Sequence, residues 1–169
     1  MADETLAEGG CACGHVRYRI AAPPFAVHCC HCACCQRETG SAFALNGLIE
    51  SEHLSLTRGE VELIETPSNS GKGQRIARCP KCHVAVWSIY GGMGDLCSFV
   101  RTGTLDDPGA FPPDIQIFTR SKLPWVVLPD GAETREAYYS SRDYDDLFGP
   151  DRAERYRALR ELTRNAAPS

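Results

Sequence analysis

Short apolar runs alternate with polar residues along most of the chain, a pattern typical of β-strands. In residues 15–20, Val16, Tyr18 and Ile20 alternate with polar side chains, and Pro23-Pro24 then ends the run. The same pattern predicts further strands at residues 25–28, 42–45, 54–56, 61–64, 84–87, 96–100 and 114–118. The strands at 54–56 and 61–64 are expected to be joined around Arg58-Gly59.

Only the C-terminal tail has helical character. Within residues 151–164, Ala153, Tyr156, Leu159 and Leu162 recur every third residue in a charged background. This spacing predicts a helix with a narrow apolar stripe. The class is therefore mainly β, a single domain with a short C-terminal helix.

Composition narrows the possible partners. A chain of 169 residues can bury the core of one domain. Its net charge of -4 argues against a nucleic-acid partner, and no apolar run approaches the roughly 20 residues that span a bilayer. The stretch Met1–Thr5 is acidic and lacks the apolar core of a signal peptide. We expect a cytoplasmic protein without a membrane partner; the sequence leaves a homo-oligomer open.

The ten cysteines are the main chemical feature. In a reducing cytosol, thiols at this density favour metal ligation over disulfides or inert buried thiols. Cys11-x-Cys13 and Cys79-x-x-Cys82 each present two sulfurs from a tight turn, and together they can complete a tetrahedral zinc site. A metal that joins such distant segments is a structural staple. The alternative is two unrelated cysteine pairs.

A second cluster, Cys30-x-Cys32-x-x-Cys35, offers three thiolates within one turn. Three protein ligands and one free position are typical of a catalytic zinc site. Alternatively, a further side chain closes the site, and the candidates are His28, His31, Cys34 and Cys97. Of the neighbouring residues, Cys29, Cys34 and His31 are expected to point elsewhere.

Two features beside this cluster have open interpretations. Arg37 can offset the negative charge of a three-thiolate site or contact an anionic substrate, and an ordinary solvated arginine is an equally good interpretation. The Ser/Gly/Asn loop at residues 67–73 is expected to be mobile, and it can act as a lid over the site or have no role.

Several motifs occur together in a recognisable order. They are GGCACGHVRY at residues 9–18, CHCACCQRETGSAF at 30–43, CPKC at 79–82 followed by Trp87, GTLDDP at 103–108 and RSKLPW at 120–125. In order and rough spacing, this set resembles the glutathione-dependent formaldehyde-activating enzyme family, which includes centromere protein V-type domains. The resemblance covers about residues 9 to 125.

The resemblance implies a zinc-stapled β-tent of small antiparallel sheets, with a zinc-binding domain at residues 7–135 and a C-terminal extension with one helix at 136–169. It implies two Zn²⁺ per chain. One is structural, on Cys11, Cys13, Cys79 and Cys82, and one is catalytic, on Cys30, Cys32 and Cys35. The implied reaction joins glutathione and formaldehyde, formally a carbon–sulfur lyase run in reverse.

This chain also departs from the family pattern. It has extra thiols at Cys29, Cys34 and Cys97, and His83 stands where glycine is frequent after the second cysteine pair. Two alternatives to an enzyme are therefore a non-catalytic zinc-binding β-tent module and a thiol-based redox or metal sensor.

Overall fold

The computed structural model describes residues 5–166. Residues 1–4 and 167–169 lie outside it. The first range carries most of the acidic stretch Met1–Thr5, and the second belongs to the expected C-terminal extension. Ten strands form two sheets in the described part of the chain, and the helices are few. The mainly β class with a C-terminal helix is confirmed. No helix within residues 5–166 is long and apolar enough to cross a membrane.

The small sheet has the antiparallel order β1-β2-β5, with β1 at Ala7–Gly10, β2 at Arg17–Ile20 and β5 at Leu54–Arg58. Strand β1 was not predicted, because Gly9-Gly10 reads as a turn. The structure explains the first glycine: a Cβ at Gly9 would lie 2.5 Å from the Tyr18 hydroxyl and 2.6 Å from the Thr104 carbonyl oxygen. Glycine here allows the sheet to pack closely.

The large sheet has the order β10-β3-β4-β9-β8-β7-β6, and only the edge pair β10–β3 is parallel. Its strands are β3 Ala26–Cys30, β4 Ala44–Glu50, β6 Glu62–Thr66, β7 Gln74–Arg78, β8 Ala85–Tyr90, β9 Cys97–Arg101 and β10 Ile115–Ile117. The strands expected at 54–56 and 61–64 exist as β5 and β6, but they do not pair. Strand β5 joins β2 in the small sheet, whereas β6 joins β7.

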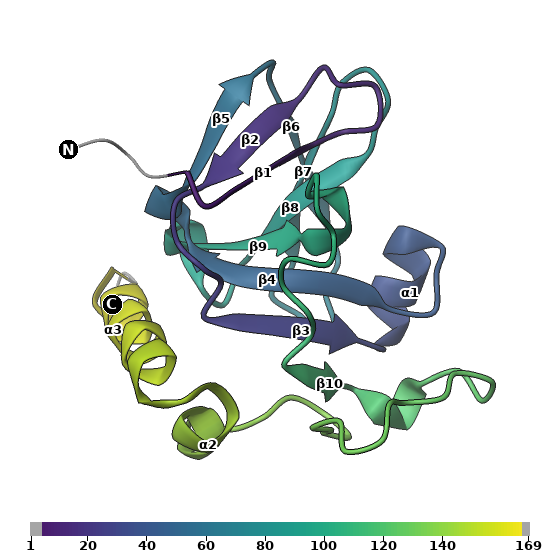
Figure 1. Cartoon of the computed structure of the whole chain (residues 1–169), viewed down its shortest axis with the longest axis vertical. Coiled ribbons are helices and arrows are strands. Elements are labelled where there is room, and N and C mark those ends of the chain that lie inside the picture. The colour runs from purple at the N-terminus through teal and green to yellow at the C-terminus, as the bar shows by residue number, and fades with distance from the viewer. Residues whose placement is uncertain (1–4, 167–169) are drawn as a thin grey trace.

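Both faces of the large sheet are covered. Leu48 and Phe99 pack into one apolar cluster with residues of the C-terminal segment, and their neighbours Ile49 and Val100 pack into another with residues of the small sheet. Successive side chains of a strand point to opposite faces, so the central strands contribute to both cores. In Figure 1 the small sheet lies at one end of the molecule, and β10 and the C-terminal helices lie toward the other.

The helices are α1 at Ala33–Thr39, α2 at Tyr144–Phe148 and α3 at Pro150–Ala166, and short 3₁₀ helices lie at Ser51–His53, Gly94–Leu96, Thr102–Thr104, Thr119–Ser121 and Ser141–Asp143. The helix expected at 151–164 is confirmed as α3. Ala153, Tyr156 and Leu159 of its apolar stripe are buried, whereas Leu162 is exposed. The expectation that only the tail is helical was wrong, because α1 begins inside the second cysteine cluster.

The C-terminal segment shares a core with the strands. Tyr139, Tyr144, Phe148 and Tyr156 belong to the same apolar cluster as Phe25, which precedes β3. This segment also holds the short helix α2, in addition to the one helix expected. A boundary near residue 135 therefore stays a prediction.

Candidate metal centres and the adjoining cavity

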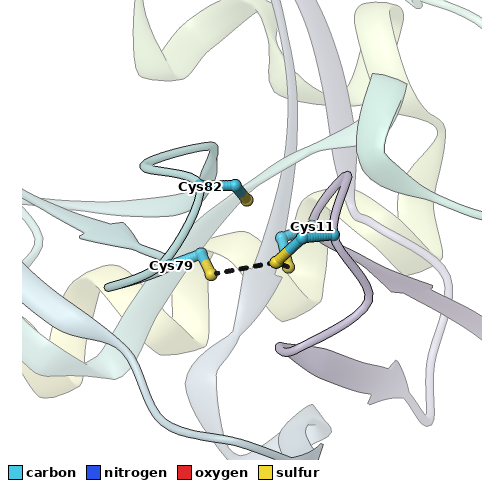
Figure 2. A group of neighbouring side chains, drawn as sticks. Cys11, Cys79 and Cys82 are labelled. Carbon is cyan, nitrogen blue, oxygen red and sulfur yellow. Dashed lines mark hydrogen bonds between the residues drawn. The ribbon is translucent and has the colours of Figure 1, made fainter.

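Four thiols from two turns converge between the sheets. Cys11 and Cys13 follow β1, whereas Cys79 and Cys82 lie between β7 and β8. The four sulfurs all lie within 4.8 Å of one another, with Cys11 Sγ 3.5 Å from Cys13 Sγ and Cys13 Sγ 3.8 Å from Cys79 Sγ. Figure 2 shows Cys11, Cys79 and Cys82 pointing into the space between the two turns.

The two turns have the same backbone design. The residue after the second cysteine of each pair has a positive φ, 72° at Gly14 and 59° at His83. Its amide donates to the carbonyl of the first cysteine, at 3.1 Å in the first turn and 2.9 Å in the second. Glycine adopts this conformation without strain, and other residues do so less readily. This explains why glycine suits position 83, where this chain has histidine.

The sulfur spacing fits a tetrahedral zinc ion. Zinc–sulfur bonds of about 2.3 Å place tetrahedral sulfurs about 3.8 Å apart, close to the two distances above. Backbone N–H groups already favour thiolates here. Hydrogen bonds from the amides of Val84 and Cys13 help to lower the pKa of Cys82 to about 6, and the Val16 amide lies 3.2 Å from Cys11 Sγ. Both the spacing and the donor set suit zinc.

The second cluster spans a strand end and a helix start. Cys30 is the last residue of β3, Cys32 is the N-cap of α1, and Cys35 lies in its first turn. The Cys32 sulfur accepts a hydrogen bond from the Cys35 amide at 3.3 Å, the contact that serine makes in an ordinary N-cap. All three sulfurs lie within 4.8 Å of one another and all three residues are buried. Helix capping and sulfur clustering are thus achieved by the same residues.

Charge makes this cluster suited to a cation. Hydrogen bonds from the Cys30 and Cys35 thiols lower the pKa of Cys32 to about 2. Its partner Cys30 has a strongly raised pKa, because its proton is shared with those sulfurs and its thiol is buried. Without a cation, the cluster therefore favours a single thiolate, at Cys32, which accepts hydrogen bonds from the Cys30 and Cys35 thiols. A divalent metal would remove this restriction and allow all three to ionise.

The candidates for a fourth ligand lie outside this group. Within residues 5–166, no histidine, cysteine or carboxylate joins the three sulfurs within the same 4.8 Å. His31 is buried and its Nε2 lies 2.8 Å from Gln116 Oε1, and Cys29 Sγ lies 3.6 Å from the same nitrogen. Cys97 lies on β9 opposite Glu50 and outside the three-thiol group. These three residues point elsewhere, as expected of Cys29 and His31.

A cavity of about 300 Å³ adjoins the three thiols. It is lined by all three cysteines and by residues of the loop before β7, of β8 and β9, and of the C-terminal segment. Its walls include Cys34, which was expected to face elsewhere, and also His28, Asn46 and Tyr90. The 67–73 loop thus contributes to the walls of the cavity through Ser68, Asn69, Ser70 and Lys72.

Arg37 does not line this cavity. It is exposed on α1, so a contact with a substrate anion, one of the interpretations above, gains no support from its position. The basic side chains that do line the cavity are Lys72 and Arg160. Sequence reasoning missed both of them, because neither lies near a cysteine motif.

Hydroxyl groups of the C-terminal segment also reach the cavity. Tyr138 and Tyr156 line it, and their oxygens lie 3.4 Å apart. The Tyr138 hydroxyl donates to Tyr139 at 3.3 Å, and the Tyr139 oxygen lies 2.7 Å from His28 Nε2. Burial lowers the pKa of His28 to about 3, so this histidine is neutral and its Nε2 shares one hydrogen bond with the Tyr139 hydroxyl. This series of hydrogen-bonded tyrosines therefore ends at a buried histidine.

A buried ion pair holds α1 against the large sheet. Glu38 of α1 receives hydrogen bonds from Arg101 of β9 at 2.8 Å and from Arg78 of β7 at 2.6 Å. The side chains of Glu38 and Arg101 are only 6% and 8% exposed. Arg101 also donates to Asn46, which lines the cavity. These ion pairs therefore hold helix α1, which carries Cys34 and Cys35, against the large sheet.

Replacing Glu38 with glutamine should lower the free energy of unfolding by about 3 kcal/mol, because removing one partner of a buried pair leaves an uncompensated charge on Arg101. Chemical denaturation measures this loss. Glu133→Gln is the control, since Glu133 pairs with Arg135 at an exposed site and should cost less than about 1 kcal/mol. Equal losses in the two variants would contradict the prediction.

Fold and site together define a mainly β protein with two cysteine clusters suited to metal ions and a cavity beside one of them. The family model described as "Glutathione-dependent formaldehyde-activating enzyme" matches residues 6–121. The chain therefore belongs to the glutathione-dependent formaldehyde-activating enzyme family, as the resemblance of the cysteine motifs indicated.

Two individual proteins are also similar. A protein of Halomonas elongata with the name "Putative glutathione-dependent formaldehyde-activating enzyme" is 26% identical over 140 residues, which cover 77% of this chain and 85% of that protein. A crystal structure of a Rhodobacter sphaeroides protein aligns with a TM-score of 0.47 and 19% identity, over 62% of this chain and 91% of the other.

Proposed function

We propose that this protein is a zinc-dependent enzyme that joins a thiol such as glutathione to formaldehyde or another small aldehyde, formally a carbon–sulfur lyase. The observation that carries the proposal is the three-thiol cluster of Cys30, Cys32 and Cys35 at the wall of a cavity. Family membership supports the substrate classes. The four-thiol cluster would hold a structural zinc.

In this proposal, Cys30, Cys32 and Cys35 would hold the catalytic zinc at the wall of the cavity where the substrate binds. When bound, zinc supplies a Lewis acid that favours the thiolate form of an incoming thiol. The cavity walls hold the thiol and the aldehyde together, which makes the encounter effectively intramolecular. The thiol sulfur bonds to the aldehyde carbon, and the carbonyl oxygen takes up a proton.

The tyrosine hydroxyls are suited to that oxygen. Tyr138 and Tyr156 line the cavity, and a hydroxyl can rotate to donate toward a ligand. Burial raises the pKa of Tyr156 well above its ordinary value, so it keeps its proton and acts as a donor. We assign these hydroxyls to stabilising the oxygen as negative charge develops there. The proton released by the substrate thiol balances the one that the oxygen gains.

Titration of the cobalt-substituted protein with glutathione tests this function. Cobalt–thiolate absorption bands report the number of bound sulfurs. We expect one of the two sites to change to a four-sulfur spectrum, because the three-thiol site would accept the substrate sulfur. An unchanged spectrum would contradict an exchangeable position and favour a non-catalytic binding module. Reversible oxidation of the thiols with release of the metal would instead favour a redox sensor.

A further inference from the structure

Two basic side chains from segments distant in sequence line the cavity beside the three thiols. Lys72 belongs to the loop before β7, whereas Arg160 lies on α3, and both line the cavity. Both are exposed to solvent. Helix α3 lies beyond residues 6–121, the part of the chain that matches the family model. This pair therefore combines a residue of the matched domain with one of the C-terminal extension.

Arg160 differs from the arginines before it on α3. Those three each pair with a carboxylate: Arg152 with Asp114, Arg155 with Glu50 and Arg157 with Asp145. No ion pair within residues 5–166 involves Arg160 or Lys72. The guanidinium instead lies 3.9 Å from the Met93 sulfur, a weak acceptor. Both cations are therefore available to an anionic ligand.

A third residue in the cavity wall also lacks a partner. Gln74 is 7% exposed, and its Oε1 is buried without a hydrogen-bond partner in the described structure. Its Nε2 donates to the Pro67 carbonyl at 3.2 Å, which fixes the orientation of the amide because the reverse orientation would bring two oxygens together. A buried acceptor without a donor costs about 1–3 kcal/mol. A ligand N–H that reached this oxygen would remove this cost.

We propose that Lys72 and Arg160 bind the carboxylates of the thiol substrate and that Gln74 Oε1 accepts one of its N–H groups. They would thereby select an acidic thiol with amide or ammonium groups over a small neutral thiol. This inference rests on the proposed function for its thiol, but the recognition itself involves no metal. One of the two cations, Arg160, would come from the C-terminal helix α3. Charge-assisted hydrogen bonds to carboxylates are strong enough for such selection.

S-Methylglutathione is a suitable probe, because it keeps both carboxylates and the amides but cannot provide a thiolate. Isothermal titration calorimetry should detect its binding to the zinc-loaded protein. Arg160→Met and Lys72→Met should each weaken binding by about tenfold, as expected for the loss of one charge-assisted contact at an exposed site. Arg157→Met is the matched control, since Arg157 lies on the same helix and does not line the cavity. It should leave the affinity within about twofold.

A second titration separates recognition from a structural role. The cobalt-substituted protein is titrated with 2-mercaptoethanol, which has no carboxylate. Its affinity should be the same in Arg160→Met, Lys72→Met and wild type, and an equal loss of both ligands in the variants would overturn the proposal. Failure of S-methylglutathione to bind the wild type would also overturn it. If S-methylglutathione binds as expected but no thiol changes the cobalt spectrum, recognition stands and the proposed function fails.

Discussion

Replacing Cys79 with serine should unfold the domain or strongly lower its stability. Cys79 is fully buried between the two sheets and belongs to the four-thiol cluster. A structural zinc contributes about 10–16 kcal/mol of apparent binding energy in small zinc domains, as much as the whole stability of a typical domain, about 5–15 kcal/mol. We expect the variant to lose one metal equivalent and either its cooperative unfolding transition or at least about 10 °C in Tm. Metal analysis and calorimetry measure both.

Cys34→Ser is the control for this variant. Cys34 is half-buried and belongs to neither thiol cluster, so both metal equivalents should remain and the stability should change by no more than about 1 kcal/mol. A Cys79→Ser protein that keeps two metals and unfolds within a few degrees of wild type would show that the four-thiol site is not a staple.

Replacing Cys32 with serine should have the opposite balance of effects. Serine is a preferred N-cap residue, so the contact with the Cys35 amide and the start of α1 should survive. The three-thiol site loses a sulfur, and a metal at such a site is worth several kcal/mol of transition-state stabilisation. We expect one metal equivalent to be lost and the catalysed rate of thiol addition to formaldehyde to fall by at least about 100-fold. The rate must be measured above the uncatalysed background.

Cys29→Ser is the matched control for this second variant. Cys29 adjoins Cys30 in sequence, but its sulfur lies toward His31 and outside the three-thiol cluster. It should keep both metals and the full rate. If Cys32→Ser unfolds the protein to the same extent as Cys79→Ser, the two sites are equally structural and the case for an enzyme weakens.

Local sequence patterns predicted much of this architecture. Strands with strict alternation, such as the one containing Val16, Tyr18 and Ile20, were located correctly because their periodicity is visible within a few residues. The short helix α1 was missed, since seven residues are too few to show a helical period. Strand β1 was missed because Gly9 serves close packing against Tyr18 and against the Thr104 carbonyl, which is distant in sequence.

The sequence by itself predicted which cysteines share a cluster, because pairs and triplets in tight turns can present their sulfurs together. That the turns at residues 11–13 and 79–82 meet was decided by the tertiary structure. Only the tertiary structure decided what surrounds them. The cavity is lined by the loop before β7, the start of β7 and the C-terminal segment, so Lys72, Gln74, Tyr138, Tyr156 and Arg160 share its walls with the cysteines of residues 30–35. Such contacts depend on how helices and loops pack across a sheet, and no local pattern encodes them. Arg37 was a candidate because of its nearness in sequence, with an ordinary solvated arginine as the equal alternative, and helix α1 leaves it exposed.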